Sequence, residues 1–209
     1  MSDPSEIGQR LGRMSGVELG GFVLGPTIGG FVMDSTHNIH LPFLVCGAFA
    51  AAGALLIALH QFPSPPIGER HRVAFDLLRL PQIRAGVLMG VALFVPVGFY
   101  DATLDRYLTD MGASNRLIGF AFLTFGVPFA LFASRGGRLS DRYGPLKIGV
   151  LVSCAVAPLT AYYGFITVPL VFVSLGLVEG TLQSMGIPAA SSIIAIGAPE
   201  GRVAAAQGL

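Results

Sequence analysis

The chain has 209 residues, of which 53% are hydrophobic and only 12% charged, and its formal net charge is +1. A soluble domain normally carries about twice that share of charged residues, and here the apolar residues stand in long blocks rather than in short alternating runs. These features exclude an ordinary soluble domain and indicate a protein of the lipid bilayer. The near-neutral charge gives no reason to expect a nucleic-acid partner.

Six apolar stretches each come close to the ~20 residues with which a helix crosses the hydrocarbon core. They cover residues 14–33, 42–62, 86–106, 116–134, 147–165 and 168–190. The predicted fold class is therefore an all-α integral membrane protein with six transmembrane helices.

The same pattern divides the chain into three parts. Residues 1–62 hold an N-terminal segment and two predicted helices, residues 63–84 form a central loop, and residues 85–209 hold four helices and the start of a further one. Within the loop, the sequence of residues 73–80 is typical of a short amphipathic helix that lies on the membrane surface.

Basic residues indicate the orientation of these helices. If the six helices alternate in direction, eleven of the thirteen lysines and arginines fall on one side of the membrane, and only Arg106 and Arg116 fall on the other. By the positive-inside rule, both termini and the central loop are cytoplasmic. We therefore expect a multi-pass protein of the cell's inner (plasma) membrane.

The first predicted helix carries glycines at regular spacing, in the pattern G-x8-G-x3-G-P-x2-G-G. Its fixed positions are Gly12, Gly21, Gly25, Pro26, Gly29 and Gly30. Because Gly21, Gly25 and Gly29 recur every four residues, they form a bare stripe along which a second helix can approach closely. Pro26 removes a backbone donor and is expected to bend the helix.

A second pattern, G-x-L-x-D-R-x-G, follows the fourth predicted helix. Its fixed positions are Gly137, Leu139, Asp141, Arg142 and Gly144. We expect a loop here, in which the glycines permit a tight reversal and Asp141 either caps a helix start or pairs with an arginine. Arg142 is expected to stay in the cytosol.

Both patterns resemble signatures of the major facilitator superfamily of transporters. The glycine pattern resembles the antiporter signature of the family's fifth transmembrane helix. The second pattern resembles the loop that joins helices two and three, and again eight and nine. The family usually has a basic pair directly after the last glycine, whereas this chain continues with Pro145, Leu146 and Lys147.

The number of helices between the two patterns fits this resemblance. If the first predicted helix corresponds to helix five, four helices precede the loop between helices eight and nine, and four are predicted. The resemblance thus implies a partial major-facilitator fold with helices five to ten. It implies transport of a small molecule, most simply proton-coupled efflux of the multidrug type, in which the loop latches the cytoplasmic side.

Acidic residues inside the predicted helices are candidates for the transport site. Glu179 lies eleven residues into the sixth helix, about 16 Å along it and close to mid-membrane, where an ionised carboxylate costs at least ~2.5–3.5 kcal/mol. Gln183 lies one turn later on the same face. Glu179 is either a site for a proton or a cationic substrate, or a protonated acid that is hydrogen-bonded between helices.

Asp101 and Tyr100 are further candidates, in the outer third of the third helix. Asp101 faces either a cavity or a hydrated helix end, and Asp105, one turn later, is more typical of a hydrated end. Glu18 lies one turn inside the first helix, where a structural role is favoured. Aromatic rings of the third and fourth helices could stack on a flat substrate or simply pack: Phe94, Phe99, Tyr100, Phe120, Phe122, Phe125 and Phe129.

No pattern of an enzyme occurs, since a P-loop, a nucleophile elbow and a C-x-x-C pair are all absent. His37 and His40 lack further ligands for a metal, and Cys46 and Cys154 lie in apolar runs. We expect no enzymatic activity, no cofactor and no metal. The expected partners are a small-molecule substrate, protons, the lipid bilayer and the helices that a complete transporter would add.

Two other interpretations remain open. One is a facilitator or symporter for a sugar or small metabolite, although the absence of mid-membrane arginines disfavours an anionic substrate. The other is a non-transporting, truncated membrane scaffold or partner subunit, since a central cavity lined by two halves cannot be built from six helices alone.

Overall fold

The computed structural model describes residues 7–36, 38, 40–60 and 74–209. Six long helices follow in chain order: α1 (Ile7–Thr36), α2 (Leu41–Leu59), α3 (Pro81–Asp110), α4 (Asn115–Tyr143), α5 (Pro145–Tyr163) and α6 (Pro169–Gly197). A 3₁₀ helix, η2 (Phe75–Arg79), precedes α3, and a short helix, α7 (Val203–Gln207), follows α6. All six predicted helices are confirmed, and each is long and apolar enough to cross a membrane.

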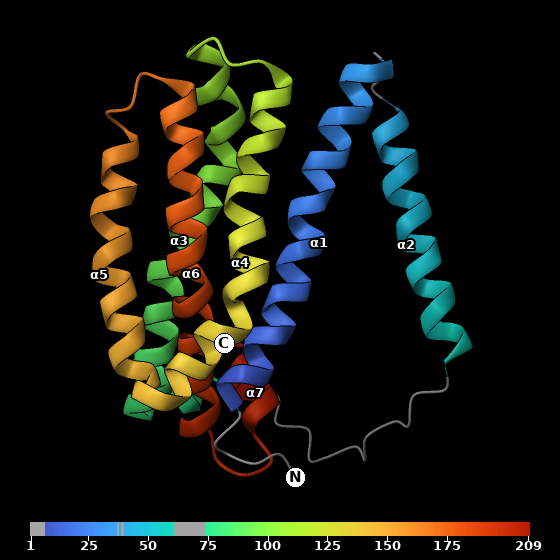
Figure 1. Cartoon of the computed structure of the whole chain (residues 1–209). Helices are drawn as coiled ribbons and strands as arrows, with labels where there is room; N and C mark the ends of the chain where they lie inside the picture. The colour runs from blue at the N-terminus through green and yellow to red at the C-terminus, as the bar shows by residue number, and fades with distance from the viewer. Residues whose placement is uncertain (1–6, 37, 39, 61–73) are drawn as a thin grey trace.

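The helices form a bundle with one outlying hairpin (Figure 1). α3, α4, α5 and α6 pack side by side, and α1 lies along α4. α2 meets α1 at one end of the molecule and diverges from it towards the other end, where α7 and the C-terminus lie (Figure 1). None of the α2 side chains is buried.

The prediction of a loop at residues 137–144 is wrong, because nearly all of this segment is helical. α4 continues as a helix to Tyr143, and only Gly144, with a φ of 92°, reverses the chain. The neighbouring glycines serve packing instead of a turn. A methyl group on Gly136 would overlap the carbonyl oxygen of Ser184, so α4 and α6 approach backbone to backbone there.

The helix after the predicted central loop begins earlier than expected. α3 begins at Pro81 and η2 occupies Phe75–Arg79, both inside the predicted loop of residues 63–84. The amphipathic helix expected at residues 73–80 is this short 3₁₀ turn. Residues 63–73 and His37 lie outside the described residues, and the division of the chain into three parts stays a prediction.

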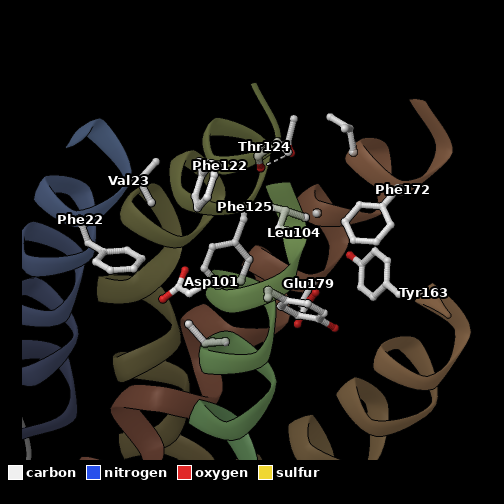
Figure 2. Close-up of a pocket in the computed structure, with 15 residues that line it drawn as sticks. Phe22, Val23, Asp101, Leu104, Phe122, Thr124, Phe125, Tyr163, Phe172 and Glu179 are labelled. Atoms are coloured by element: carbon white, nitrogen blue, oxygen red, sulfur yellow. Dashed lines mark hydrogen bonds between the residues drawn. The ribbon is translucent and has the colours of Figure 1, made fainter. Parts of the chain in front are cut away.

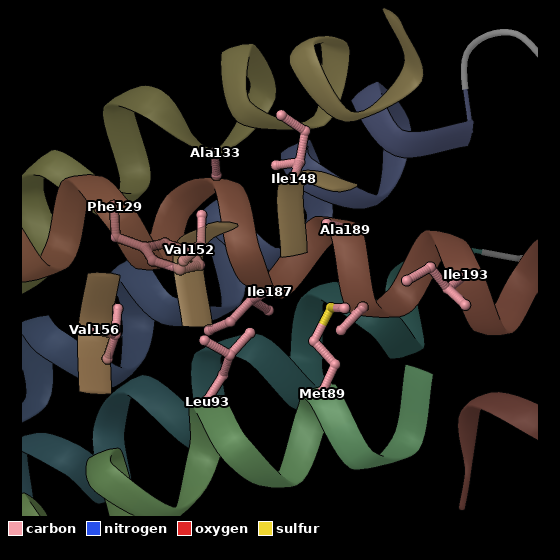
Figure 3. Packing of buried hydrophobic residues seen from close by; sticks show 11 residues of the cluster. Met89, Leu93, Phe129, Ala133, Ile148, Val152, Val156, Ile187, Ala189 and Ile193 are labelled. Atoms are coloured by element: carbon pink, nitrogen blue, oxygen red, sulfur yellow. The ribbon is translucent and has the colours of Figure 1, made fainter. Parts of the chain in front are cut away.

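The main hydrophobic core lies where α3, α4, α5 and α6 meet (Figure 3). Phe129 of α4, 1% exposed, and Leu93 of α3, 0% exposed, are among its largest buried side chains. Ile187 of α6 and Val152 of α5 pack in the same cluster. Lipid is as apolar as these side chains, so close packing rather than removal from water holds this core together.

A smaller cluster fastens η2 to the end of the bundle. Leu77, 2% exposed, packs with Ile83, Ile194 and Ala206, which joins η2 to α3, α6 and α7. Beside it, the guanidinium nitrogens of Arg202 donate two hydrogen bonds to the Asp76 carboxylate, at 2.6 and 2.9 Å. The segments before α3 and after α6 are thereby held together.

Replacing Leu77 by alanine is expected to destabilise this end of the bundle. The substitution leaves a cavity among side chains that close on Leu77 from three helices, at a cost of about 2 kcal/mol. Unfolding of the detergent-solubilised chain by a denaturing detergent measures the loss. Phe75→Ala is the control, because Phe75 lies on the same 3₁₀ turn and is 68% exposed. An equal loss in both variants would contradict a buried anchor at Leu77.

Candidate functional site

Three of the four predicted transport residues come together at one small cavity. Glu179 of α6 lines it with Tyr100 and Asp101 of α3, and the enclosed space is about 60 Å³. Most of the remaining wall is apolar or aromatic: Phe22, Val23, Val97, Leu104, Ala121, Phe122, Phe125, Phe172 and Val173. Figure 2 shows Asp101 beside Phe22 and Phe125 at one end and Glu179 near Tyr163 at the other. We call this space the central cavity.

Glu179 is almost completely enclosed by protein, at 2% exposure. Its carboxyl group interacts with the Tyr163 hydroxyl and the Gln183 amide, yet Oε1 forms no hydrogen bond among the described residues. No lysine or arginine of the described part of the chain lines the cavity. The carboxyl group therefore has polar neighbours there and no cationic one.

Gln183, the fourth candidate, lies one turn beyond Glu179 and is fully buried. Its amide nitrogen donates a 3.4 Å hydrogen bond to the carbonyl oxygen of Leu93, while its amide oxygen has no partner among the described residues. Gln183 does not line the central cavity. It supports Glu179 from one side and links α6 to α3.

Asp101 is exposed and also lines a second, larger space. This space holds about 530 Å³ between α1, α3, α4 and α6, and we call it the acidic groove. Glu18 lies in it, together with the rings of Phe94 and Phe129. Asp101 and Phe22 line both the groove and the central cavity, so the two spaces share a wall.

Asp105 lies away from this site. It lines a separate pocket between α1, α3 and α4 with Pro26 and Gly30, and its side chain is exposed. The structure therefore does not bring Asp101 and Asp105 to one cavity, as their shared helix face had allowed. That Asp105 lies at a hydrated helix end stays a prediction.

The predicted glycine stripe of α1 does not form the contact with α4. Nothing described lies within 4 Å of a methyl group added at Gly21 or Gly25, and at Gly29 only the Pro42 side chain does, at 3.9 Å. α4 instead approaches α1 at Gly12, where a methyl group would overlap the carbonyl oxygen of Ala133. The stripe at Gly21 and Gly25 stays open to an approach by a helix from outside the described bundle.

Asp141 caps a helix start, but the helix is a distant one. The backbone N–H of Gln9 donates a 3.0 Å hydrogen bond to Asp141 Oδ2 across 132 residues of sequence. A carboxylate at this place satisfies a free donor of the first turn of α1 and complements the helix dipole. Arg142 lies over the Tyr143 ring, 5.3 Å from its centroid. The pattern at residues 137–144 thus joins the end of α4 to the start of α1.

Sequence reasoning missed two features of the site. Tyr163, 4% exposed, comes from the last turn of α5 and faces Glu179, and its position in the fold alone reveals this role. Gly176 and Gly180 let the α4 backbone approach α6 on either side of Glu179: methyl groups there would crowd the Thr124 hydroxyl and overlap the Phe125 carbonyl oxygen. Their four-residue spacing was the available signal.

Known proteins resemble this chain along most of its length. The MFS-type transporter SLC18B1 of Homo sapiens is 26% identical over 196 residues, which cover 91% of this chain and 42% of that protein. The multidrug resistance protein MdtG of Klebsiella pneumoniae is 24% identical over 196 residues, or 90% of this chain and 48% of that protein. The probable sulfoacetate transporter SauU of Cupriavidus necator is 28% identical over 100 residues.

The chain spans less than half the length of these relatives. No solved structure matches it. The sequence profile of the Major Facilitator Superfamily matches residues 1–209. With six apolar helices long enough to cross a bilayer, relatives that are transporters rather than enzymes, and a family match over its whole length, the chain is a multi-pass membrane protein and belongs to the major facilitator superfamily.

Proposed function

We propose that the chain takes part in proton-coupled efflux of a small molecule, with Glu179 as the proton-carrying group. The observation on which this proposal rests is the position of Glu179. It lies on the wall of the central cavity, is 2% exposed, and has no cationic neighbour among the residues that line the cavity. An isolated carboxylate in such surroundings is costly. A carboxyl group placed there therefore couples proton uptake and release to events in the adjoining spaces.

The acidic groove is the proposed place for the substrate. Its volume of about 530 Å³ lies within the range of small-molecule sites, whereas the 60 Å³ of the central cavity admits only water or protons. Glu18 and Asp101 supply negative charge, and the rings of Phe94 and Phe129 supply apolar surface. This chemistry suits an organic cation with an apolar or aromatic body, and the name of the multidrug resistance relative is compatible with such a substrate.

The contact between Asp141 and α1 is the proposed latch. It lies at the end of the molecule where α4 carries Arg135, Arg138 and Arg142. A hydrogen bond from the Gln9 backbone N–H to Asp141 joins the start of α1 to the end of α4. A motion of α1 relative to α4 breaks it at a modest free-energy cost, as a switching contact requires. In this proposal both termini are cytoplasmic and the protein resides in the inner membrane.

A second candidate function is a partner subunit that transports only together with other helices. It is favoured by α2, a 19-residue apolar helix without a buried side chain, and by the relatives of more than twice this length. Purification of the chain with a protein that supplies further helices, and loss of flux without that protein, would support this alternative.

The proposal predicts that Glu179→Gln abolishes proton coupling. Substrate efflux from vesicles that contain the protein is recorded together with proton flux at several pH values. We expect the variant to lose the proton flux and the pH dependence of efflux, because an amide carries no exchangeable acid proton. Exchange of substrate down its own gradient is retained.

Glu200→Gln is the matched control, because Glu200 is exposed in the link after α6 and lines none of these spaces. We expect it to behave like the unsubstituted protein. Unaltered proton coupling in Glu179→Gln would refute the assignment of Glu179. Asp101→Asn provides a second test. The loss of a negative charge in the acidic groove should weaken the binding of a cationic substrate more than the binding of a neutral analogue.

A further inference from the structure

A second groove approaches the central cavity from the side opposite the acidic groove. It lies between α3 and α5, holds about 500 Å³, and is lined near its outer end by Arg106 and Asp110. These two residues form an exposed ion pair, 82% and 58% accessible, so this end of the groove is in contact with water. We call this space the outer groove.

Only a thin wall separates the outer groove from the central cavity. Tyr100, Leu104, Tyr163 and Phe172 line both spaces. The rings of Tyr100 and Tyr163 meet edge to face with centroids 5.3 Å apart, and the Tyr163 and Phe172 rings are 4.3 Å apart. The wall therefore consists of side chains, two of which carry a hydroxyl group.

Tyr107 holds this wall in place. Its hydroxyl lies 3.1 Å from the carbonyl oxygens of both Tyr163 and Ile166, and it ties α3 to the end of α5 and the turn that follows. The hydrogen bond to Tyr163 fixes the backbone of this residue and leaves its ring on the side of Glu179 (Figure 2). The wall is a defined structure rather than a chance contact of side chains.

Polar atoms within the wall lack hydrogen-bond partners. The Tyr100 hydroxyl, the Thr160 hydroxyl and Glu179 Oε1 are buried and form no hydrogen bond among the described residues. Thr160 lines the outer groove, Tyr100 lines both spaces, and Glu179 lines the central cavity. Buried polar groups normally find a partner, and a cavity of about 60 Å³ is large enough for water.

We propose that Glu179 exchanges its proton through this wall with water in the outer groove, by way of the Thr160 and Tyr100 hydroxyls. A hydronium ion in the outer groove gives a proton to the Thr160 hydroxyl, which passes its own proton to the Tyr100 hydroxyl. The Tyr100 hydroxyl releases its own proton through water in the central cavity to the Glu179 carboxylate, so the products are water, a carboxylic acid and unchanged threonine and tyrosine side chains. The proton then has its own route, separate from the acidic groove at Asp101.

The inference rests on the proposed role of Glu179 as the proton site, and one spectroscopic experiment tests it without requiring transport. The chain is reconstituted in lipid bilayers, and infrared spectra record the carboxyl C=O band that is lost in Glu179→Gln. After a change from H₂O to D₂O, the shift of this band with time gives the rate at which the Glu179 proton exchanges.

We expect Tyr100→Phe and Thr160→Val to slow this exchange by about tenfold or more, because each removes one hydroxyl of the relay and keeps the side-chain shape. Thr181→Val is the matched control. Thr181 lies two residues from Glu179 on α6, and its hydroxyl donates to the Leu177 carbonyl oxygen at 2.7 Å outside the cavity. Its exchange rate should equal that of the unsubstituted chain.

Unchanged exchange in both relay variants would overturn the route, as would an equal slowing by Asp101→Asn, which would direct the proton through the acidic groove. Neither result affects the assignment of Glu179. If no carboxyl band responds to pH or disappears in Glu179→Gln, Glu179 carries no exchangeable proton, and the proposed function fails together with the route.

Discussion

Gly180→Ala is expected to destabilise the bundle by about 3 kcal/mol, the upper part of the usual range for overpacking. A methyl group at this position would overlap the carbonyl oxygen of Phe125 on α4. A flexible side chain could turn away, but a helix carbonyl cannot move without its whole turn. α4 and α6 would have to separate, which also loosens the packing at Gly176 and around Glu179.

The measurement is the free energy of unfolding in mixed micelles, with Gly90→Ala as the matched control. Gly90 lies inside α3, and nothing described lies within 4 Å of a methyl group added there. Alanine at Gly90 should stabilise the helix by up to about 1 kcal/mol through its higher helix propensity. If both alanine variants were equally stable, the close contact between α4 and α6 would be wrong.

Phe129→Ala is expected to cost about 3 kcal/mol or more. Phe129 is 1% exposed, packs in the main core and lies with its ring nearly parallel to that of Phe125, 28° between planes. In a bilayer the hydrophobic effect contributes little to this loss of stability, because lipid is as apolar as the protein core. The loss comes from the cavity and from the contacts that its neighbours forfeit.

The same unfolding assay tests this expectation against Phe43→Ala. Phe43 lies on α2 and is 76% exposed, so its removal leaves no cavity and should change stability by less than about 0.5 kcal/mol. Similar losses in the two variants would mean that ring size rather than burial determines stability here, contrary to the core described above.

The number and order of the helices could be predicted from sequence because crossing a membrane demands about 20 apolar residues. The ends of the helices could not, since hydropathy marks the hydrocarbon layer and not the last hydrogen-bonded turn. α4 continues through residues 135–143, which carry three arginines, because Gly136 and Ser140 are buried against neighbouring helices. The charged residues of this segment therefore misled about where the helix ends.

For the candidate site, depth along a helix singled out Glu179 and Asp101 as candidates, but it does not reveal what surrounds them. The counting of residues cannot reveal that Tyr163, at the far end of another helix, turns towards Glu179. The glycine spacing of α1 predicted a close helix contact, yet the equivalent spacing at Gly176 and Gly180 of α6 makes one within this chain. A periodic stripe indicates that a backbone can be approached, and the rest of the fold decides which helix approaches it.

The long helices of this fold differ in length, so they differ in how well they match the thickness of a membrane. α2 has 19 residues, which at 1.5 Å each span about 28 Å and match a hydrocarbon layer of ~30 Å. α3, α4 and α6 have 29 or 30 residues and must tilt or reach into the headgroups. Their tilt is fixed by one another, whereas α2 has no buried side chain to fix its own. We therefore expect a change in bilayer thickness to alter the inclination of α2 more than the angles between the helices of the bundle.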